Sequence, residues 1–213
     1  LALEVIRRLK AEYPDAGCTL DYDHAWQLLV SVRLAAQCTD ARVNIVVEEL
    51  FAKYPSVAAL AAAEPEDIEA IVKPCGLGHS KARDISACMR MLRDKYDCRV
   101  PNTFEELLAL PGVGRKSANL IMGDVFGKPA IVTDTHCIRL CNKIGLVDGI
   151  KEPQKVEMAL WKIIPPAEGS DLCHRFVMHG RAVCNARKPE CEKCCLKDIC
   201  RTAREAAGQQ AEP

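Results

Sequence analysis

The stretch Leu110-Pro111-Gly112-Val113-Gly114-Arg115-Lys116 decides both the fold and the site. Its proline fixes one backbone angle, and Gly112 and Gly114 permit angles or close approaches that a side chain would forbid. We therefore expect a tight, exposed turn. The free N–H groups at the start of the next helix form a candidate phosphate site, with Arg115 and Lys116 beside it.

Helices are predicted on both sides of this turn. Thr103 and Glu106 have the spacing of a capping box, which predicts a short helix ending near Leu110. Apolar residues recur at helical spacing from 118 to 125, which predicts a second helix that starts at about Gly114 or Arg115.

Asp134 is the second candidate site residue. The helix that starts near Lys116 and the extended run that follows it are long enough for the chain to return to the turn. One amine and one carboxylate would then lie beside a phosphate site. Two simpler interpretations stay open, because Asp134 alone can be the N-cap of the next helix and Lys116 alone can be a solvated lysine.

The composition indicates an all-α protein. The chain has 213 residues and is 49% hydrophobic, so it can bury a substantial core. Apolar residues recur at helical spacing throughout, from the near-continuously apolar stretch 24–36 to the C-terminal third. We expect Asp23 to cap the helix of that stretch and Ser80 to cap a later one. No apolar run approaches eighteen residues, so no membrane partner is expected.

Four of the thirteen cysteines have the spacing C-x6-C-x2-C-x5-C, which predicts a metal site. Structural zinc usually takes two close pairs, whereas only one such pair occurs here, so the wide gaps favour a larger cluster. Cys195 is an adjacent spare thiol. The remaining cysteines are expected to be buried free thiols in a reducing compartment. The predicted ligands are Cys184, Cys191, Cys194 and Cys200.

Charge is balanced overall but not locally. Lysine plus arginine and aspartate plus glutamate each number 29, so a surface for a polyanion requires segregated charge. Between Cys173 and Arg204 eight cationic residues face three acidic ones. They can offset the negative charge of a thiolate-bound metal, or Arg187 and Lys188 can contact phosphates. Both interpretations stay open.

Two further residues lie on predicted loops. Gln37 follows the apolar stretch 24–36, where its simplest role is to satisfy loop backbone groups. Leu77 lies between Gly76 and Gly78, and its side chain either folds back onto the core or stays exposed as a wedge.

Together, the stretch from Leu110 to Lys116, the sequence Thr133-Asp134-Thr135-His136 and the four C-terminal cysteines resemble the endonuclease III family of DNA glycosylases. The resemblance covers nearly the whole chain. It implies a helix-hairpin-helix motif, a catalytic aspartate and a [4Fe–4S] cluster. The chain departs from the family at Thr133, where an apolar residue is usual.

The resemblance also implies an architecture of two helical lobes with a DNA-binding groove between them. Residues 18–128 would form a continuous helical-barrel lobe with the helix-hairpin-helix. Residues 1–17 and 129–213 would form the second lobe, with the [4Fe–4S] loop at 184–200. Gly112, Gly114, Arg115, Arg187 and Lys188 would contact DNA.

The implied activity is a bifunctional DNA glycosylase with an abasic-site lyase step, acting on damaged pyrimidines in duplex DNA. Lys116, with its pKa lowered by burial and by neighbouring positive charge, would be the nucleophile, and Asp134 would assist it. Gln37 would fill the gap left by the extruded base, and Leu77 would wedge into the opposite strand.

Two alternatives are kept. One is a mismatch glycosylase of the same superfamily, which acts on adenine, or on thymine or uracil opposite guanine. The other is a non-catalytic helix-hairpin-helix DNA-binding protein with a structural metal. We expect a monomer in the cytoplasm, associated with the nucleoid, while an organelle address upstream of Leu1 stays open.

Overall fold

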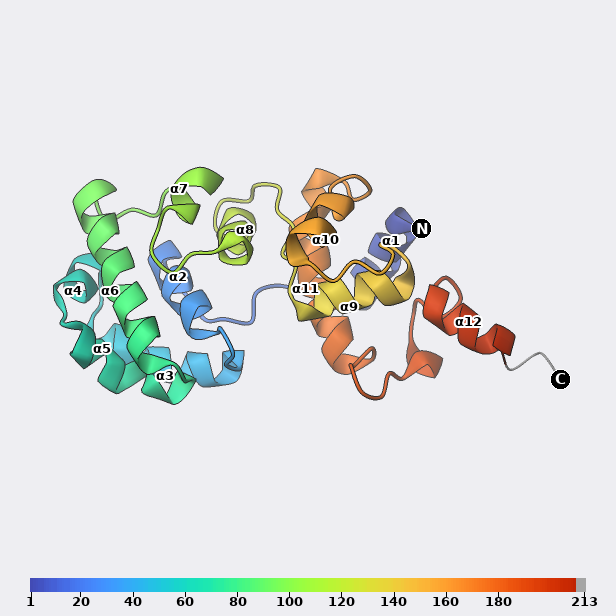
Figure 1. Cartoon of the computed structure of the whole chain (residues 1–213), viewed down its shortest axis with the longest axis horizontal. Coiled ribbons are helices and arrows are strands. Elements are labelled where there is room, and N and C mark those ends of the chain that lie inside the picture. The colour runs from blue at the N-terminus through green and yellow to red at the C-terminus, as the bar shows by residue number, and fades with distance from the viewer. Residues whose placement is uncertain (210–213) are drawn as a thin grey trace. The chain divides into compact units, whose positions relative to one another are not determined.

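Helices make up all the regular structure in the residues that the computed structural model describes, 1–209 (Figure 1). The predicted all-α class is therefore confirmed. The last four residues of the predicted second lobe, 210–213, lie outside the described part. The chain divides into two units: Cys18–Gly127, here called the hairpin unit, and Leu1–Gly17 with the residues from Lys128 onward, the cysteine unit.

The hairpin unit is built around α2, which buries seven of its ten residues and packs against α3, α6 and α8. The apolar stretch 24–36 is therefore central, as predicted. The long helix α6 packs against α4 and α5. The elements are α2 (Ala25–Leu34), α3 (Asp40–Lys53), α4 (Val57–Ala62), α5 (Pro65–Val72), η1 (Lys73–Cys75), α6 (Gly78–Lys95), α7 (Phe104–Leu108) and α8 (Arg115–Asp124).

The cysteine unit joins the N-terminal helix to the last third of the chain. Helix α11 packs against α1 and α9, and α9 also packs against α12 (Figure 1). The elements are α1 (Ala2–Glu12), α9 (Thr135–Ile144), α10 (Pro153–Leu160), η2 (Pro166–Glu168), α11 (Gly169–Ala182), η3 (Cys191–Lys193) and α12 (Arg201–Gln209).

Among the caps predicted for α2, α6 and α7, one is confirmed and two are wrong. Thr103 Oγ1 accepts the backbone N–H of Glu106, so this cap is confirmed. The predicted Asp23 cap is wrong, because Gln27 Oε1 instead accepts the N–H groups of Asp23 and His24 at 2.8 and 2.9 Å. The predicted Ser80 cap is also wrong, because α6 already begins at Gly78.

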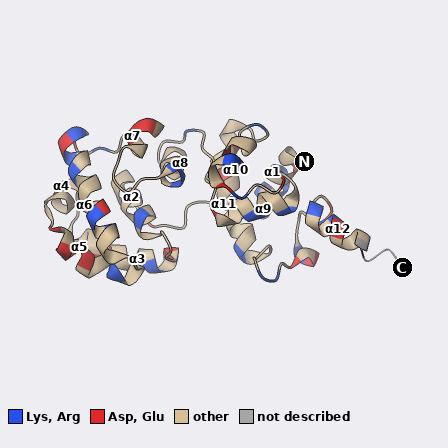
Figure 2. Ribbon diagram, in the orientation of Figure 1, with Lys and Arg blue, Asp and Glu red and all other residues tan. Residues whose placement is uncertain are grey.

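Charge gathers at particular helix ends. Acidic residues occupy the first turns of α5 and α7, where they complement the positive end of each helix (Figure 2).

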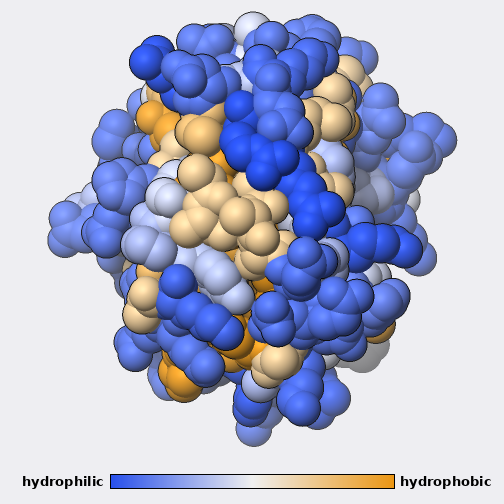
Figure 3. All heavy atoms as spheres, turned by 90° about the vertical axis from the view of Figure 1, so that its left-hand side faces the viewer, coloured by the Kyte–Doolittle hydropathy of each residue, from blue (hydrophilic) through white to orange (hydrophobic). Residues whose placement is uncertain are grey.

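Hydrophilic residues dominate the face of the hairpin unit shown in Figure 3. None of the described helices is long and apolar enough to span a membrane.

Candidate functional site

The predicted turn lies between α7 and α8, and Gly112 is the residue that it requires. Gly112 has φ +76°, in the left-handed region. A Cβ here would also lie 2.9 Å from Cβ of Asp84 and 3.1 Å from Cδ of Arg33. Arg33 and Asp84 form an ion pair at 2.9 Å. These two paired side chains pack directly against Gly112. Only glycine fits both the backbone angle and this surface.

Gly114 is different. It is the N-cap of α8 with extended backbone, φ −94° and ψ −179°, and a Cβ would meet nothing within 4 Å. Neither the backbone angle nor a contact within the protein therefore requires glycine here, and a close approach by an outside group stays a prediction. The open space on this side leaves the start of α8 accessible to an outside group.

The two cationic residues that open α8 differ in how they are held. The guanidinium of Arg115 lies over the ring of Phe104, 4.9 Å from its centroid, and so connects the two helices of the hairpin. Lys116 is exposed. The expected burial of Lys116 is therefore wrong for the protein alone, and its amine is open to a ligand.

Asp134 is the N-cap of α9, and its Oδ1 accepts the backbone N–H of Cys137 at 2.7 Å. The simpler interpretation of this residue is thus correct. Within the described residues Oδ2 takes no hydrogen bond, and the side chain is only partly buried. The cap therefore fixes the orientation of a carboxylate that keeps one oxygen available.

Gln37 and Leu77 share an unusual backbone conformation. Their φ angles are +55° and +49°, so both are non-glycine residues in the left-handed region. Leu77 is 58% exposed, which rules out the interpretation that it folds back onto the core. Gln37 is also exposed, and its side chain makes no hydrogen bond within the described residues. A non-glycine residue keeps this conformation only where the surrounding structure holds it.

The four predicted ligands line one small cavity in the cysteine unit. Cys195 does not line it. Within the described residues, no three Cys, His, Asp or Glu side chains are grouped closely enough to hold one metal ion. A cavity shared by four thiols that do not converge on one point fits a multi-iron cluster better than a tetrahedral zinc ion. The lining thiols are those of Cys184, Cys191, Cys194 and Cys200.

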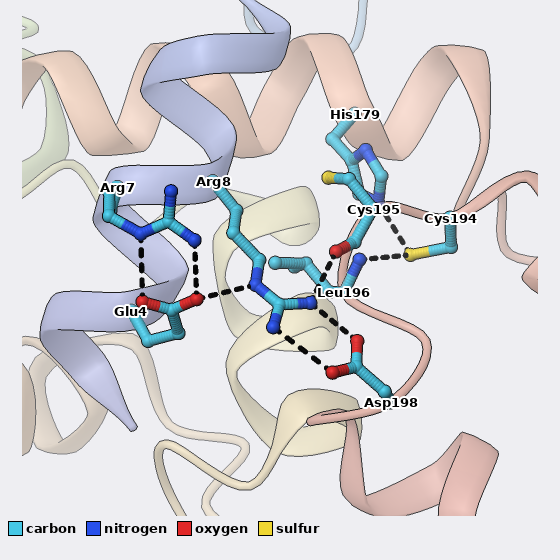
Figure 4. Close-up of polar contacts among 8 residues, drawn as sticks. All are labelled: Glu4, Arg7, Arg8, His179, Cys194, Cys195, Leu196 and Asp198. Atoms are coloured by element: carbon cyan, nitrogen blue, oxygen red, sulfur yellow. Dashed lines mark hydrogen bonds and ion pairs between the residues drawn. The ribbon is translucent and has the colours of Figure 1, made fainter.

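Two nitrogen atoms lie within hydrogen-bond distance of Cys194 Sγ, one of the sulfurs that line the cavity. His179 Nε2 lies 3.2 Å from Cys194 Sγ, and the backbone N–H of Leu196 donates to the same sulfur at 3.4 Å (Figure 4). The hydroxyl of Tyr13 lies 2.9 Å from the other ring nitrogen of His179. Burial raises the pKa of the Cys194 thiol to about 11 and lowers that of His179. In a neutral His179, Tyr13 donates its hydroxyl proton to Nδ1, so the ring proton lies on Nε2 and is donated to the Cys194 sulfur.

Arg8 joins α1 to the cysteine loop (Figure 4). Its guanidinium pairs with Glu4, and donates to Asp198 Oδ2 at 3.0 Å and to the Cys195 carbonyl at 2.9 Å. Arg7 and Arg8 lower the pKa of the Glu4 carboxyl to about 2. Cys195 therefore meets α1 through its backbone, which is a role separate from that of the cavity-lining thiols.

Arg187 and Lys188 are exposed on the loop between the first two cavity-lining cysteines. Neither forms an ion pair within the described residues. By contrast, Lys193 pairs with Glu190, and Lys197 pairs with Glu192 at 2.5 Å. Arg187 and Lys188 therefore keep charges that no acidic side chain of the described residues neutralises.

Sequence reasoning missed three residues that organise these sites. Arg8 lies in an ordinary surface pattern and His179 lies in a helix far from the cysteine spacing, so neither carries a local signal. Lys81 follows the loop of Leu77 and is fully buried. The apolar residues that follow Lys81 at helical spacing would have marked it as inward-facing, but one of its two acceptors, the Leu34 carbonyl, is too distant in sequence to be predicted.

Known proteins match this chain over most of its length. Residues 30–166 match the HhH-GPD superfamily of base excision DNA repair proteins. Endonuclease III of Synechocystis sp. is 43% identical over 203 residues, which cover 95% of this chain and 92% of that protein. A non-covalent endonuclease III–DNA complex matches with TM-score 0.90 and 39% identity, covering 97% of this chain and 96% of that one. A trapped endonuclease III–DNA covalent intermediate matches with the same TM-score and identity, covering 96% of each chain.

These matches place the chain among the helix-hairpin-helix proteins of base excision DNA repair. Within that class, the chain belongs to the endonuclease III family.

Proposed function

We propose that this chain removes oxidised or ring-damaged pyrimidines from duplex DNA and then cuts the strand at the abasic site, with Lys116 as nucleophile. The enzyme class follows from the family: the chain is a base excision repair enzyme with DNA glycosylase and abasic-site lyase activities. The observation that carries the residue assignment is the exposed Lys116 in the first turn of α8, directly after the open hairpin turn.

The hairpin is proposed to bind a DNA phosphate. The first N–H groups of α8 have no partners within the helix, and Gly114 leaves the space before them open. A Gly114→Pro change, which removes one N–H, should weaken binding to all duplexes alike, and Gly114→Ala, which keeps that N–H, should weaken it less. Equal affinity of both variants would count against this site.

Base extrusion is proposed to depend on Gln37 and Leu77. A base inside a duplex cannot be reached by an enzyme, so the nucleotide must leave the stack. The exposed amide of Gln37 offers donors and acceptors to the orphaned base, and the exposed Leu77 is an apolar wedge.

Lys116 Nζ is proposed to attack C1′ of the extruded sugar with its lone pair. The bond from C1′ to the base breaks, and the base leaves with that electron pair and a proton. Nζ then loses a proton, the bond from C1′ to O4′ breaks as O4′ takes up a proton, and the nitrogen lone pair forms a protonated Schiff base between Nζ and C1′. Loss of a C2′ proton then expels the 3′ phosphate by β-elimination. Because Lys116 is exposed in the protein alone, the bound DNA must supply the desolvation that favours a neutral amine.

Asp134 is proposed to stabilise the positive charge that develops on the sugar as the base departs. Its Oδ1 is held by the Cys137 N–H, and Oδ2 remains for the substrate. A fixed carboxylate needs little reorganisation in the transition state, which is the condition for strong electrostatic stabilisation.

The four cavity-lining cysteines are proposed to hold a [4Fe–4S] cluster. When bound, it would supply four iron–thiolate bonds that fix the loop carrying Arg187 and Lys188. His179 and the Leu196 N–H would donate to the Cys194 sulfur, and Lys143, which also lines the cavity, would offset negative charge. We further propose that the protein acts as a monomer on nucleoid DNA in the cytoplasm.

The substrate proposal is tested with a set of duplexes that each carry one lesion. We expect strand cleavage at oxidised pyrimidines and at abasic sites. Faster excision of mismatched adenine, or of thymine or uracil opposite guanine, would favour the mismatch alternative. Binding without any excision would favour a non-catalytic DNA-binding protein and overturn the proposal.

A further inference from the structure

A single buried amine connects the two loops that carry Gln37 and Leu77. Lys81, in the first turn of α6, has 0% of its surface exposed. Its Nζ donates to the carbonyl of Leu34 at 2.9 Å and to the carbonyl of Cys75 at 2.9 Å. Lysine is almost never fully buried without a partner. Here the partners are two backbone carbonyls from different parts of the chain.

The two carbonyls lie where helical hydrogen bonding has ended. Leu34 is the last residue of α2, and Cys75 is the last residue of η1. Carbonyls at such positions need a donor from outside their own helix. Gln37 comes three residues after the first acceptor, and Leu77 comes two residues after the second. Lys81 therefore anchors both loops immediately before their left-handed residues.

The anchoring has a mechanical consequence. A left-handed conformation is unfavourable for a non-glycine residue, and it persists only where the surroundings hold it. Each loop has such a residue with an exposed side chain. If the amine were removed, each loop could relax independently, and two carbonyls would lose their donor.

We propose that Lys81 is a positioning residue that holds Gln37 and Leu77 in a fixed relation to one another for base extrusion, an inference that rests on the roles proposed above for those two side chains. A methionine would fill the same space without the desolvation of an amine. The two donated hydrogen bonds are therefore the feature that distinguishes lysine at this position.

The test is Lys81→Met in the full-length, cluster-loaded protein. Extrusion is followed by the fluorescence of 2-aminopurine placed beside a paired lesion, and chemistry by borohydride trapping on a pre-formed abasic site. Extrusion and excision of the paired lesion should slow by about tenfold or more, whereas trapping should stay within about twofold, as expected for loss of interactions at one step only. Melting temperature is measured alongside.

Two controls separate positioning from stability. Met89→Ala removes a fully buried side chain from the same helix and leaves the Lys81 hydrogen bonds in place, so it should lower the melting temperature without slowing extrusion selectively. Lys81→Gln keeps two N–H donors on a shorter stem and should recover part of the extrusion rate. It also serves as the test variant if Lys81→Met does not fold.

Equal losses in extrusion and trapping, or the same selective loss in Met89→Ala, would overturn the inference. Gln37→Ala and Leu77→Ala distinguish its failure from that of the proposed function. If those two variants slow extrusion and Lys81→Met does not, only the positioning role is wrong. If neither slows extrusion, the proposed roles of Gln37 and Leu77 are wrong as well.

Discussion

Asp134 Oδ1 accepts the backbone N–H of Cys137 at 2.7 Å, so the proposed catalytic carboxylate is also the N-cap of α9. The two roles can be separated by mutation. Asparagine caps a helix about as well as aspartate but carries no charge. Asp134→Asn should therefore keep the melting temperature and slow base excision by about a hundredfold or more.

Single-turnover excision and thermal unfolding measure the two effects. Asp134→Ala should lose the cap as well, at a cost of roughly 1 kcal/mol in the free energy of unfolding. A full excision rate in Asp134→Asn would leave this residue with its capping role only.

Lys116→Gln should abolish the covalent adduct that borohydride traps between enzyme and DNA. A glutamine amide keeps much of the length and polarity of lysine but has no basic lone pair to attack C1′. Affinity for damaged DNA should be nearly unchanged. The exposed Lys162 offers a control, since Lys162→Gln should trap normally. Persistent trapping in Lys116→Gln would mean that another amine forms the Schiff base.

Gly112→Ala and Gly114→Ala form a matched pair within one turn. At Gly112 the new methyl group meets Asp84 and Arg33 and the backbone has positive φ, so the free energy of unfolding should fall by about 1–3 kcal/mol. At Gly114 the methyl group enters open space on extended backbone, and the change should stay within about 0.5 kcal/mol. Chemical denaturation measures both. Similar losses would contradict the described turn.

Arg187→Gln and Lys188→Gln should each weaken DNA binding and reduce its salt dependence. Each phosphate contact contributes about 0.9 to the slope of log affinity against log salt concentration. Lys193, which is already paired with Glu190, provides the control, and Lys193→Gln should change the slope less. The slope is obtained from affinities measured over a series of salt concentrations. Equal changes in all three variants would argue against the loop as a phosphate contact.

The cysteine assignment predicts a clear difference between neighbours. Cys194→Ser should lower the iron content and the broad visible absorption of the purified protein, because Cys194 lines the cavity. Cys195→Ser should retain both, because Cys195 contacts Arg8 only through its carbonyl. Elemental analysis and absorbance spectra provide the measurement. Iron loss from Cys195→Ser alone would reverse the assignment of these two residues.

Local patterns predicted the features that depend on nearby residues. The Thr103 cap and the start of α8 both arise from interactions within a few positions, so spacing alone was sufficient. The exposed Leu77 could not be decided in the same way. A leucine between two glycines can either fold back onto the core or stay exposed. The packing of η1 against α6 determines which of these two orientations the side chain takes.

The missed features depend on contacts between distant residues. Gln27, rather than Asp23, satisfies the start of α2, because a side chain from inside the helix can reach back over its first turn. The acceptors of Lys81 are a carbonyl 47 positions away and one six positions away. No periodicity in the sequence contains this information, because the chain must first bring the end of α2 beside α6.

The ion pair between Arg8 and Asp198 joins residues that are 190 positions apart. During synthesis, α1 therefore leaves the ribosome well before its partner Asp198. Residues 18–127 are continuous, so that unit can fold on the nascent chain while α1 is still without its packing surface. Helix α1 can therefore pack against α11 only after residues 169–182 have been translated, and its Arg8 gains Asp198 as a partner later still.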